Sequence, residues 1–347
     1  MKFKKQTRKV VTAFQAAVLL VMAAHSASAV GGYNEIAVLA NSDAFISVPF
    51  TKTAEGAFTV SAVTGAVVTV SNTLTTDAYA PVDGNARYYV RLTGGTASEG
   101  LWSSISANGT HSFTLANATV AAKVSVGDTF TVYPHQTLAS LFPAGREGVS
   151  FITAGDEGLD PAATVVLVKD TQVGTDKAAS QVCSHLGQYG WYDGAGTPVN
   201  DLALEPGTFI QIRNADEAKA LDIFVSGDVP DTKLASALVT SASDNDLYLV
   251  NPFPVDVRLG QLGLENWASS EDAATFGGLV LLYDNAAAGT DKSASTICFY
   301  LTGGDNNWYD GDGTNANSLV IPAGMGVVLR DSSGVPGNGV WTVNKPY

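Results

Sequence analysis

The stretch that organises this chain reads GTDKAASQVC at residues 174–183 and returns as GTDKSASTIC at residues 289–298, an offset of 115 residues. After an insertion of two residues the offset becomes 117, and WYDG at 191–194 returns as WYDG at 308–311. Two separate motifs that recur at a nearly constant offset indicate an internal duplication. The duplication covers the C-terminal two-thirds of the chain.

Strand-like segments surround these motifs in both copies. Short stretches with β-branched or aromatic residues at every second position, such as 88–92 and 209–213, alternate with turns rich in Gly, Asn and Asp. Only two short segments, 137–142 and 259–267, have a helical pattern. The sequence therefore predicts an all-β protein of several sandwich-like or barrel-like units, with only short helices.

The first 29 residues have the three parts of a secretory signal peptide. Five basic residues and no acidic one lie before Val10, and an apolar run follows at 10–24. This run is shorter than a membrane-spanning helix requires, which disfavours the alternative of an N-terminal anchor. Small residues at 27–29 then suit a signal peptidase. We expect cleavage near Ala29 and export to the periplasm, the cell surface or the extracellular space.

The rest of the chain is too long for one hydrophobic core, so several units are expected. They are an N-terminal β domain at 30–140, β repeat unit 1 at 141–242 and β repeat unit 2 at 243–347. The full chain has 19 basic and 33 acidic residues, and loss of five basic residues with the signal peptide changes the net charge from −14 to −19. This acidity disfavours nucleic acid and anionic lipid as partners. No apolar stretch after residue 29 predicts a transmembrane segment.

Several segments resemble an uncharacterised family of exported bacterial all-β proteins, often present as several paralogues. The resemblance covers most of the mature chain and rests on RYYVRLTGG at 87–95, EGLW at 99–102, GDTFTV at 127–132, TLASLF at 137–142 and the twin GTDK loops. It implies export and β architecture. That family offers no catalytic or binding residue to carry over, so the resemblance implies nothing about mechanism.

Cys183 and Cys298 occupy the same position in the two copies, each on an expected strand. In an exported protein such a pair is a candidate for a disulfide. The alternative is that each thiol packs in the core of its own unit, too far from the other for the short Cα separation that a bridge requires.

The sequence lacks the common catalytic motifs. It contains no nucleophile elbow, phosphate-binding loop or dinucleotide fingerprint. Cys183 and His185 share a face of a strand, but Tyr300 takes the place of His185 in the second copy, which favours packing of either ring. His111 and His135 show no spacing typical of metal ligands. We therefore expect no catalytic residue and no enzyme.

The two WYDG turns form the candidate ligand site. An exposed aromatic ring beside a carboxylate can stack on a sugar and hold its hydroxyl groups, so the candidate carbohydrate ligands are Trp191, Tyr192, Asp193, Trp308, Tyr309 and Asp310. In the alternative, each Trp faces inward as the anchor of its unit, while Asp-Gly makes a tight turn.

A Gly- and Asn-rich loop in the second copy holds three candidate calcium ligands, Asp305, Asp310 and Asp312. Calcium binds carboxylate and carbonyl oxygens and is abundant outside cells. The loop lacks the distal Glu of an EF-hand, and the first copy has Ala195 in place of Asp312. Solvated turn residues are the alternative. No other cofactor is expected.

These observations favour an exported, non-enzymatic structural or adhesive protein of the cell surface or extracellular matrix, with further copies of itself or surface glycans as partners. Repeated β units suit a scaffold, and exposed strand edges can pair with other copies. The alternatives are a carbohydrate-binding protein that uses the paired WYDG turns and a secreted hydrolase. A hydrolase requires carboxylates, or a Ser and a His, that converge in a cleft.

Overall fold

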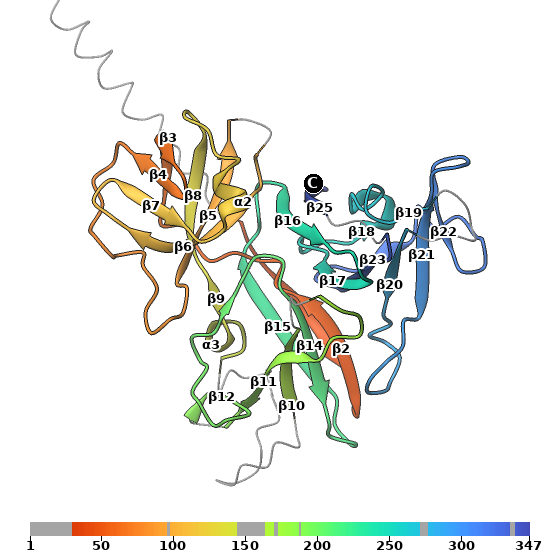
Figure 1. The fold of residues 1–347 in the computed structure, drawn as a ribbon. Coiled ribbons are helices and arrows are strands. Elements are labelled where there is room, and N and C mark those ends of the chain that lie inside the picture. The colour runs from red at the N-terminus through yellow and green to blue at the C-terminus, as the bar shows by residue number, and fades with distance from the viewer. Residues whose placement is uncertain are drawn as a thin grey trace, which may run out of the picture. The chain divides into compact units, whose positions relative to one another are not determined.

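The computed structural model describes residues 30–95, 98–143, 164–169, 173–186, 189–270, 277–333 and 337–347. The expected signal peptide at 1–29 lies outside these residues. The fold is all-β, as the alternating strand patterns predict (Figure 1). The helical elements of the described residues are α2 (Ala118–Ala121), α3 (Leu138–Leu141) and the 3-10 turn η2 (Leu259–Gln261). In this part of the chain, no helix has the length and apolar character needed to cross a membrane.

Six strands close into a barrel between residues 56 and 134. Its order is β3-β4-β7-β6-β5-β8, and the strands are β3 (Gly56–Thr64), β4 (Val67–Val70), β5 (Tyr88–Gly94), β6 (Trp102–Asn108), β7 (Ser112–Leu115) and β8 (Thr129–Pro134). Inward-facing aromatic side chains fill the barrel, because side chains alternate across each strand. Among them, the rings of Phe58 and Phe113 meet edge to face with centroids 5.2 Å apart.

Strands that precede the barrel in the sequence pair with strands that follow it. Together they form what we call the first unit. A five-stranded sheet has the order β12-β11-β10-β14-β2, and the two-stranded pairs β1-β15 and β13-β9 accompany it. The strands are β1 (Gly31–Val38), β2 (Ser42–Ser47), β9 (Gln136–Thr137), β10 (Thr164–Lys169), β11 (Ala179–His185), β12 (Trp191–Asp193), β13 (Ala203–Leu204), β14 (Phe209–Asn214) and β15 (Leu221–Asp228).

The second unit repeats these pairings. Its sheet has five strands in the same pairing order as in the first unit, β22-β21-β20-β24-β17. A further strand, β19, pairs with β21. The two-stranded pairs β16-β25 and β18-β23 accompany this sheet. The strands are β16 (Leu234–Thr240), β17 (Asn245–Val250), β18 (Val257–Arg258), β19 (Ser269–Ser270), β20 (Gly278–Leu282), β21 (Thr296–Leu301), β22 (Asn307–Asp310), β23 (Val320–Ile321), β24 (Gly326–Asp331) and β25 (Gly337–Val343).

The barrel is inserted into the first unit. It follows β2 and precedes β9, whereas only residues 251–256 connect the equivalent strands β17 and β18 of the second unit. Figure 1 shows β2 beside β14 and apart from the barrel strands. β1 and β2 thus lie in the expected domain 30–140 but pair with strands of the expected unit 141–242. The three expected ranges stay a prediction, and the strand pairing defines the units below.

A pair of three-residue ion clusters joins the two units, and we call each cluster a clasp. In the first clasp, Asp43 on β2 is fully buried and Arg213 on β14 binds it through two hydrogen bonds, Nε to Oδ1 at 2.8 Å and Nη2 to Oδ2 at 2.9 Å. The GTDK loop of the second unit then reaches across. Its Asp291 pairs with Arg213, and the backbone N–H of Asp291 donates to Oδ2 of Asp43 at 2.6 Å.

The second clasp is the reciprocal of the first. Arg330 on β24 holds the buried Asp246 through Nε and Nη2, and the GTDK loop of the first unit supplies Asp176 to the same guanidinium at 2.8 Å. Asp176 and Asp291 both have positive φ angles, 47° and 50°. Asp tolerates this left-handed conformation better than most residues, which explains its place in both loops.

An apolar cluster lies between the two units. The ring of Phe45 lies 5.7 Å from that of Phe209 and 4.3 Å from that of Tyr283 of the second unit, and Phe209 also contacts Tyr248 at 5.0 Å. Residues Gly31–Tyr347 accordingly form one compact body. The interface between the two units thus combines buried aromatic rings with the ion pairs of the two clasps.

We expect Asp43→Asn to destabilise the folded protein. The substitution leaves Arg213 with a single carboxylate, and loss of one partner of a buried ion pair typically costs 3–5 kcal/mol. Because the Arg213 side chain is 28% exposed, solvent offsets part of this loss and we expect about 2 kcal/mol. Urea denaturation measures the change. Asp222→Asn on the exposed face of β15 makes the same chemical change outside a clasp and should leave the free energy of unfolding unchanged; equal losses in both variants would contradict the role of the clasp.

Candidate functional site

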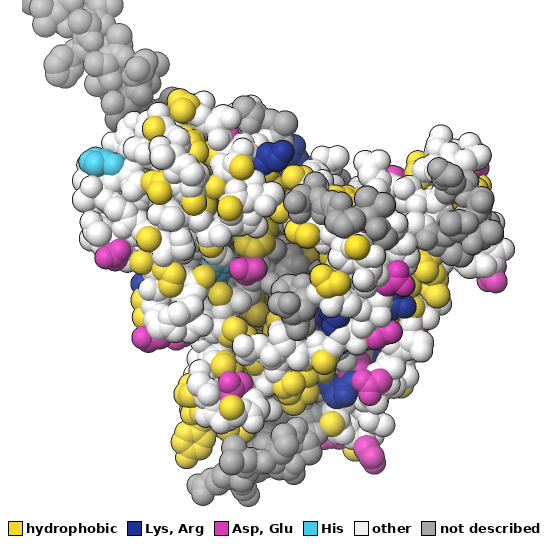
Figure 2. All heavy atoms as spheres, in the orientation of Figure 1, with side chains coloured by type: hydrophobic (Ala, Val, Ile, Leu, Met, Phe, Trp, Pro, Cys, Tyr) yellow, Lys and Arg dark blue, Asp and Glu magenta, His cyan; other side chains and the backbone are white. Residues whose placement is uncertain are grey.

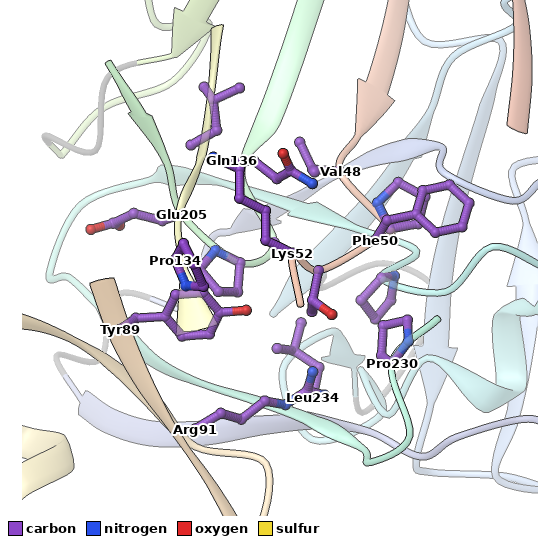
Figure 3. Close-up of a pocket in the computed structure, with 16 residues that line it drawn as sticks. Val48, Phe50, Lys52, Tyr89, Arg91, Pro134, Gln136, Glu205, Pro230 and Leu234 are labelled. Atoms are coloured by element: carbon purple, nitrogen blue, oxygen red, sulfur yellow. The ribbon is translucent and has the colours of Figure 1, made fainter. Parts of the chain in front are cut away.

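A pocket lies where the barrel meets the first unit and the linker at 229–233 that leads to β16 (Figure 3). About 430 Å³ of space is unfilled there, part of it open to solvent. The polar side chains that line it include Lys52, Tyr89, Arg91, Gln136 and Glu205. Proline rings and Phe50 supply much of the remaining wall, so polar and apolar groups both face the pocket.

A polar cluster of Ser104, His135 and Glu205 adjoins this pocket. Ser104 Oγ on β6 lies 3.1 Å from Nε2 of His135 and donates to Oε1 of Glu205 at 3.2 Å. Serine has a single hydroxyl hydrogen, and Ser104 donates it to the Glu205 carboxylate. The ring nitrogen of His135 therefore has to be the donor in its hydrogen bond with Ser104. A general base must instead accept the hydrogen of its nucleophile.

The environment of this cluster also differs from that of a catalytic triad. Ser104 and His135 are 7% and 1% exposed, so a substrate cannot contact their side chains. Burial lowers the pKa of His135 to about 4, and the ring of Tyr89 lies 4.9 Å from it. Much of Glu205 remains exposed, yet desolvation around its carboxyl group raises its pKa. The cluster therefore joins the barrel to the first unit through hydrogen bonds.

The two WYDG turns hold their tryptophans inside the protein. Trp191 and Trp308 are each 1% exposed and belong to the cores of the first and second units. Trp191 Nε1 donates to the carbonyl of Phe142 at 3.2 Å. The sugar-stacking hypothesis requires an accessible indole face, and neither ring offers one. Tyr192 and Tyr309 are half-buried, and their role as carbohydrate ligands stays a prediction.

The carboxylates of these turns bind their own backbone. Asp193 Oδ1 accepts from the N–H groups of Ala195 and Thr197, and Asp310 Oδ1 accepts equivalently from Asp312 and Thr314, at 2.8–3.0 Å. Each Asp thus closes an Asx-type turn, the arrangement that favours Asp before Gly. The same bonding in both copies explains why WYDG repeats.

The candidate calcium ligands do not form a ready site. Asp305 accepts a hydrogen bond from the Tyr309 hydroxyl at 2.7 Å, which lowers the pKa of Asp305, while Asp310 closes its turn. Within the described ranges, no three His, Cys, Asp or Glu side chains gather so as to hold a metal ion. On the face drawn in Figure 2, Asp and Glu side chains are spread over the surface, and several lie near Lys and Arg side chains. Calcium binding by Asp305, Asp310 and Asp312 stays a prediction.

The two cysteines do not form the candidate disulfide. Cys183 and Cys298 are both free thiols, and each is fully buried in the core of its own unit. Each side chain contributes to a separate core, so the packing alternative describes the structure. Burial raises the pKa of the Cys183 thiol to about 12 and that of Cys298 to about 11.

Sequence reasoning did not identify the residues of the pocket. Lys52, Tyr89 and Arg91 come from the chain that enters the barrel and from β5, whereas Glu205 follows β13 more than a hundred residues later. No local spacing connects them. The nearest residue that the sequence singles out is His135, and it shows no spacing typical of metal ligands.

In comparisons with known proteins, no family model, curated protein or solved structure matches this chain.

Thiol titration tests the packing of the cysteines. Because only the thiolate reacts rapidly, the raised pKa values and burial predict that neither thiol of the native chain reacts readily with Ellman's reagent. In guanidinium chloride without any reductant, both thiols should react. Prior reduction should not change the number of thiols that react. A denatured chain with no reactive thiol would show that the two cysteines are bridged.

The pH dependence of stability tests the burial of His135. Its pKa is about 4 in the folded protein against 6.5 for the free side chain, so the unfolded chain binds the proton first as pH falls. The free energy of unfolding should therefore decrease by about 3 kcal/mol between about pH 6.5 and pH 4. His135→Gln should lose this decrease. Glu205, whose raised pKa acts in the opposite direction, is present in both proteins.

Urea unfolding across this pH range gives the measurement. His111→Gln, at an exposed position, is the matched control and should follow the original chain. Parallel pH profiles of the original chain and His135→Gln would contradict the assignment.

Proposed function

We propose that this protein is a non-enzymatic structural or adhesive component of the cell surface or extracellular matrix, and that copies assemble through the free edge of β1. Export by the signal peptide at 1–29 is part of the same proposal. The observation that carries it is a difference between two equivalent strands. β1 and β16 hold the same position in the two units, but among the described residues only β16 has a neighbour along its outer edge.

The edge of β16 is covered by the barrel. Ala235 bridges Leu101, and its N–H donates to the carbonyl of Gly100 at 3.0 Å. Trp102 Nε1 donates to Ser236 Oγ at 3.2 Å. These contacts use the backbone groups at the start of the strand, so β16 has less edge to offer to another chain.

The edge of β1 has no such cover among the described residues. β1 pairs with β15 over its whole length, Gly31–Val38, and with no other strand of the described chain. Alternate residues of β1 are exposed, with Tyr33 70% exposed. An exposed strand edge of this length presents unpaired backbone groups to another sheet. Addition of a strand from a second copy is the β-augmentation mode of binding.

Assembly is tested with the chain purified without residues 1–29. Wild-type protein should form larger species as its concentration rises, in sedimentation velocity and electron microscopy. The double variant Tyr33→Lys and Ala37→Lys places two positive charges on exposed positions of β1 and should remain monomeric, since charged residues block edge pairing.

The matched control is Val239→Lys, at a 59% exposed position of β16. It should assemble like wild type. Wild-type protein that stays monomeric at every concentration of protein, salt and calcium would refute the proposal, as would equal assembly of the β1 variant.

A further inference from the structure

The pocket beside the barrel contains a buried cation, Arg91, that forms no ion pair with the described residues. Arg91 on β5 is 3% exposed, and its Nη2 donates to the backbone carbonyls of Thr232 and Lys233 at 2.9 and 2.6 Å. No ion pair joins it to an acidic side chain in the described residues, and its Nε has no hydrogen-bond partner. The two carbonyls hold the linker in place, but they are neutral acceptors and form no ion pair with the guanidinium.

A second cation faces the same space. Lys52 lines the pocket, is partly buried and forms no ion pair within the described chain. Desolvation lowers the pKa of its ammonium group, and the field of Asp201 offsets only part of this effect. A charged group in such an environment gains from an anion placed beside it.

The pocket wall contains a single carboxylate, that of Glu205. Figure 3 shows this carboxylate turned away from the centre of the pocket. It accepts a hydrogen bond from Ser104 Oγ. The hydroxyl group of Tyr89 points toward the centre in the same view. The remaining polar lining therefore offers mainly hydrogen-bond donors and positive charge.

We propose that this pocket binds a small anion through a single carboxylate or phosphate group, held by Lys52 and Arg91. Tyr89 and Gln136 supply further donors, and the proline rings with Phe50 contact the apolar part of the ligand. The proposed ligand is small, with a few heavy atoms beyond its charged group. The site does not depend on assembly through β1.

Isothermal titration calorimetry with three probes tests this site in the otherwise intact chain. At least one of the two anions, acetate or inorganic phosphate, should bind with a Kd of about 1 mM. Acetamide has nearly the shape of acetate without its charge and should not bind. The comparison of acetate with phosphate identifies which anionic group the pocket prefers.

Lys52→Gln is the decisive variant, because Arg91 also holds the linker and its replacement can unfold the chain. A lost charge-assisted contact should weaken binding about tenfold. The matched control Lys219→Gln removes the same charge from an exposed site of the first unit and should change binding by less than about twofold. NMR shifts of the bound state should be confined to the residues around the pocket, at 48–52, 89–91, 134–136, 204–207, 230–234 and 252.

Three results would overturn the proposal. They are the absence of saturable binding by either anion, equal binding of acetamide and acetate, and unchanged affinity of Lys52→Gln with a thermal stability like that of the original chain.

Discussion

The reciprocal clasp is the contact on which the arrangement of the two units depends. Each clasp needs three groups, and neither unit has them all: Asp43 and Arg213 come from one unit and Asp291 from the other. A fully buried carboxylate such as Asp43 is costly unless it is paired and hydrogen-bonded. The GTDK loop completes this pairing with a side chain and a backbone N–H, so burial of the acid and contact between the units occur together.

Insertion of the barrel distinguishes two units that share the same strand pairings. Without an insertion, the second unit connects β17 to β18 through residues 251–256. In the first unit the barrel occupies this position, covers the edge of β16 and brings Tyr89 and Arg91 next to the linker. The pocket results from this insertion. The insertion also covers the edge of β16, whereas the equivalent strand β1 pairs only with β15 among the described residues.

The motifs that are most visible in the sequence serve the fold. In both copies the Trp of WYDG fills a core, its Asp closes a turn, and the Asp of GTDK completes a clasp. Two copies that satisfy the same contacts keep the same residues at those positions. Residues with a candidate binding role, such as Lys52 and Arg91, lie outside the repeated motifs and therefore gave no signal by repetition.

The sequence by itself determined the all-β class and the limited helical content, because strand periodicity and turn residues are local properties of the chain. It also showed the GTDK and WYDG motifs that recur at a nearly constant offset. It also posed the right alternatives for Cys183 and Trp191 without deciding between them. Only the tertiary structure decided that both are buried, that β2 pairs with β14 across the inserted barrel, and that Asp43 meets Arg213, 170 residues away. Such contacts follow from packing between distant segments, which no local pattern encodes.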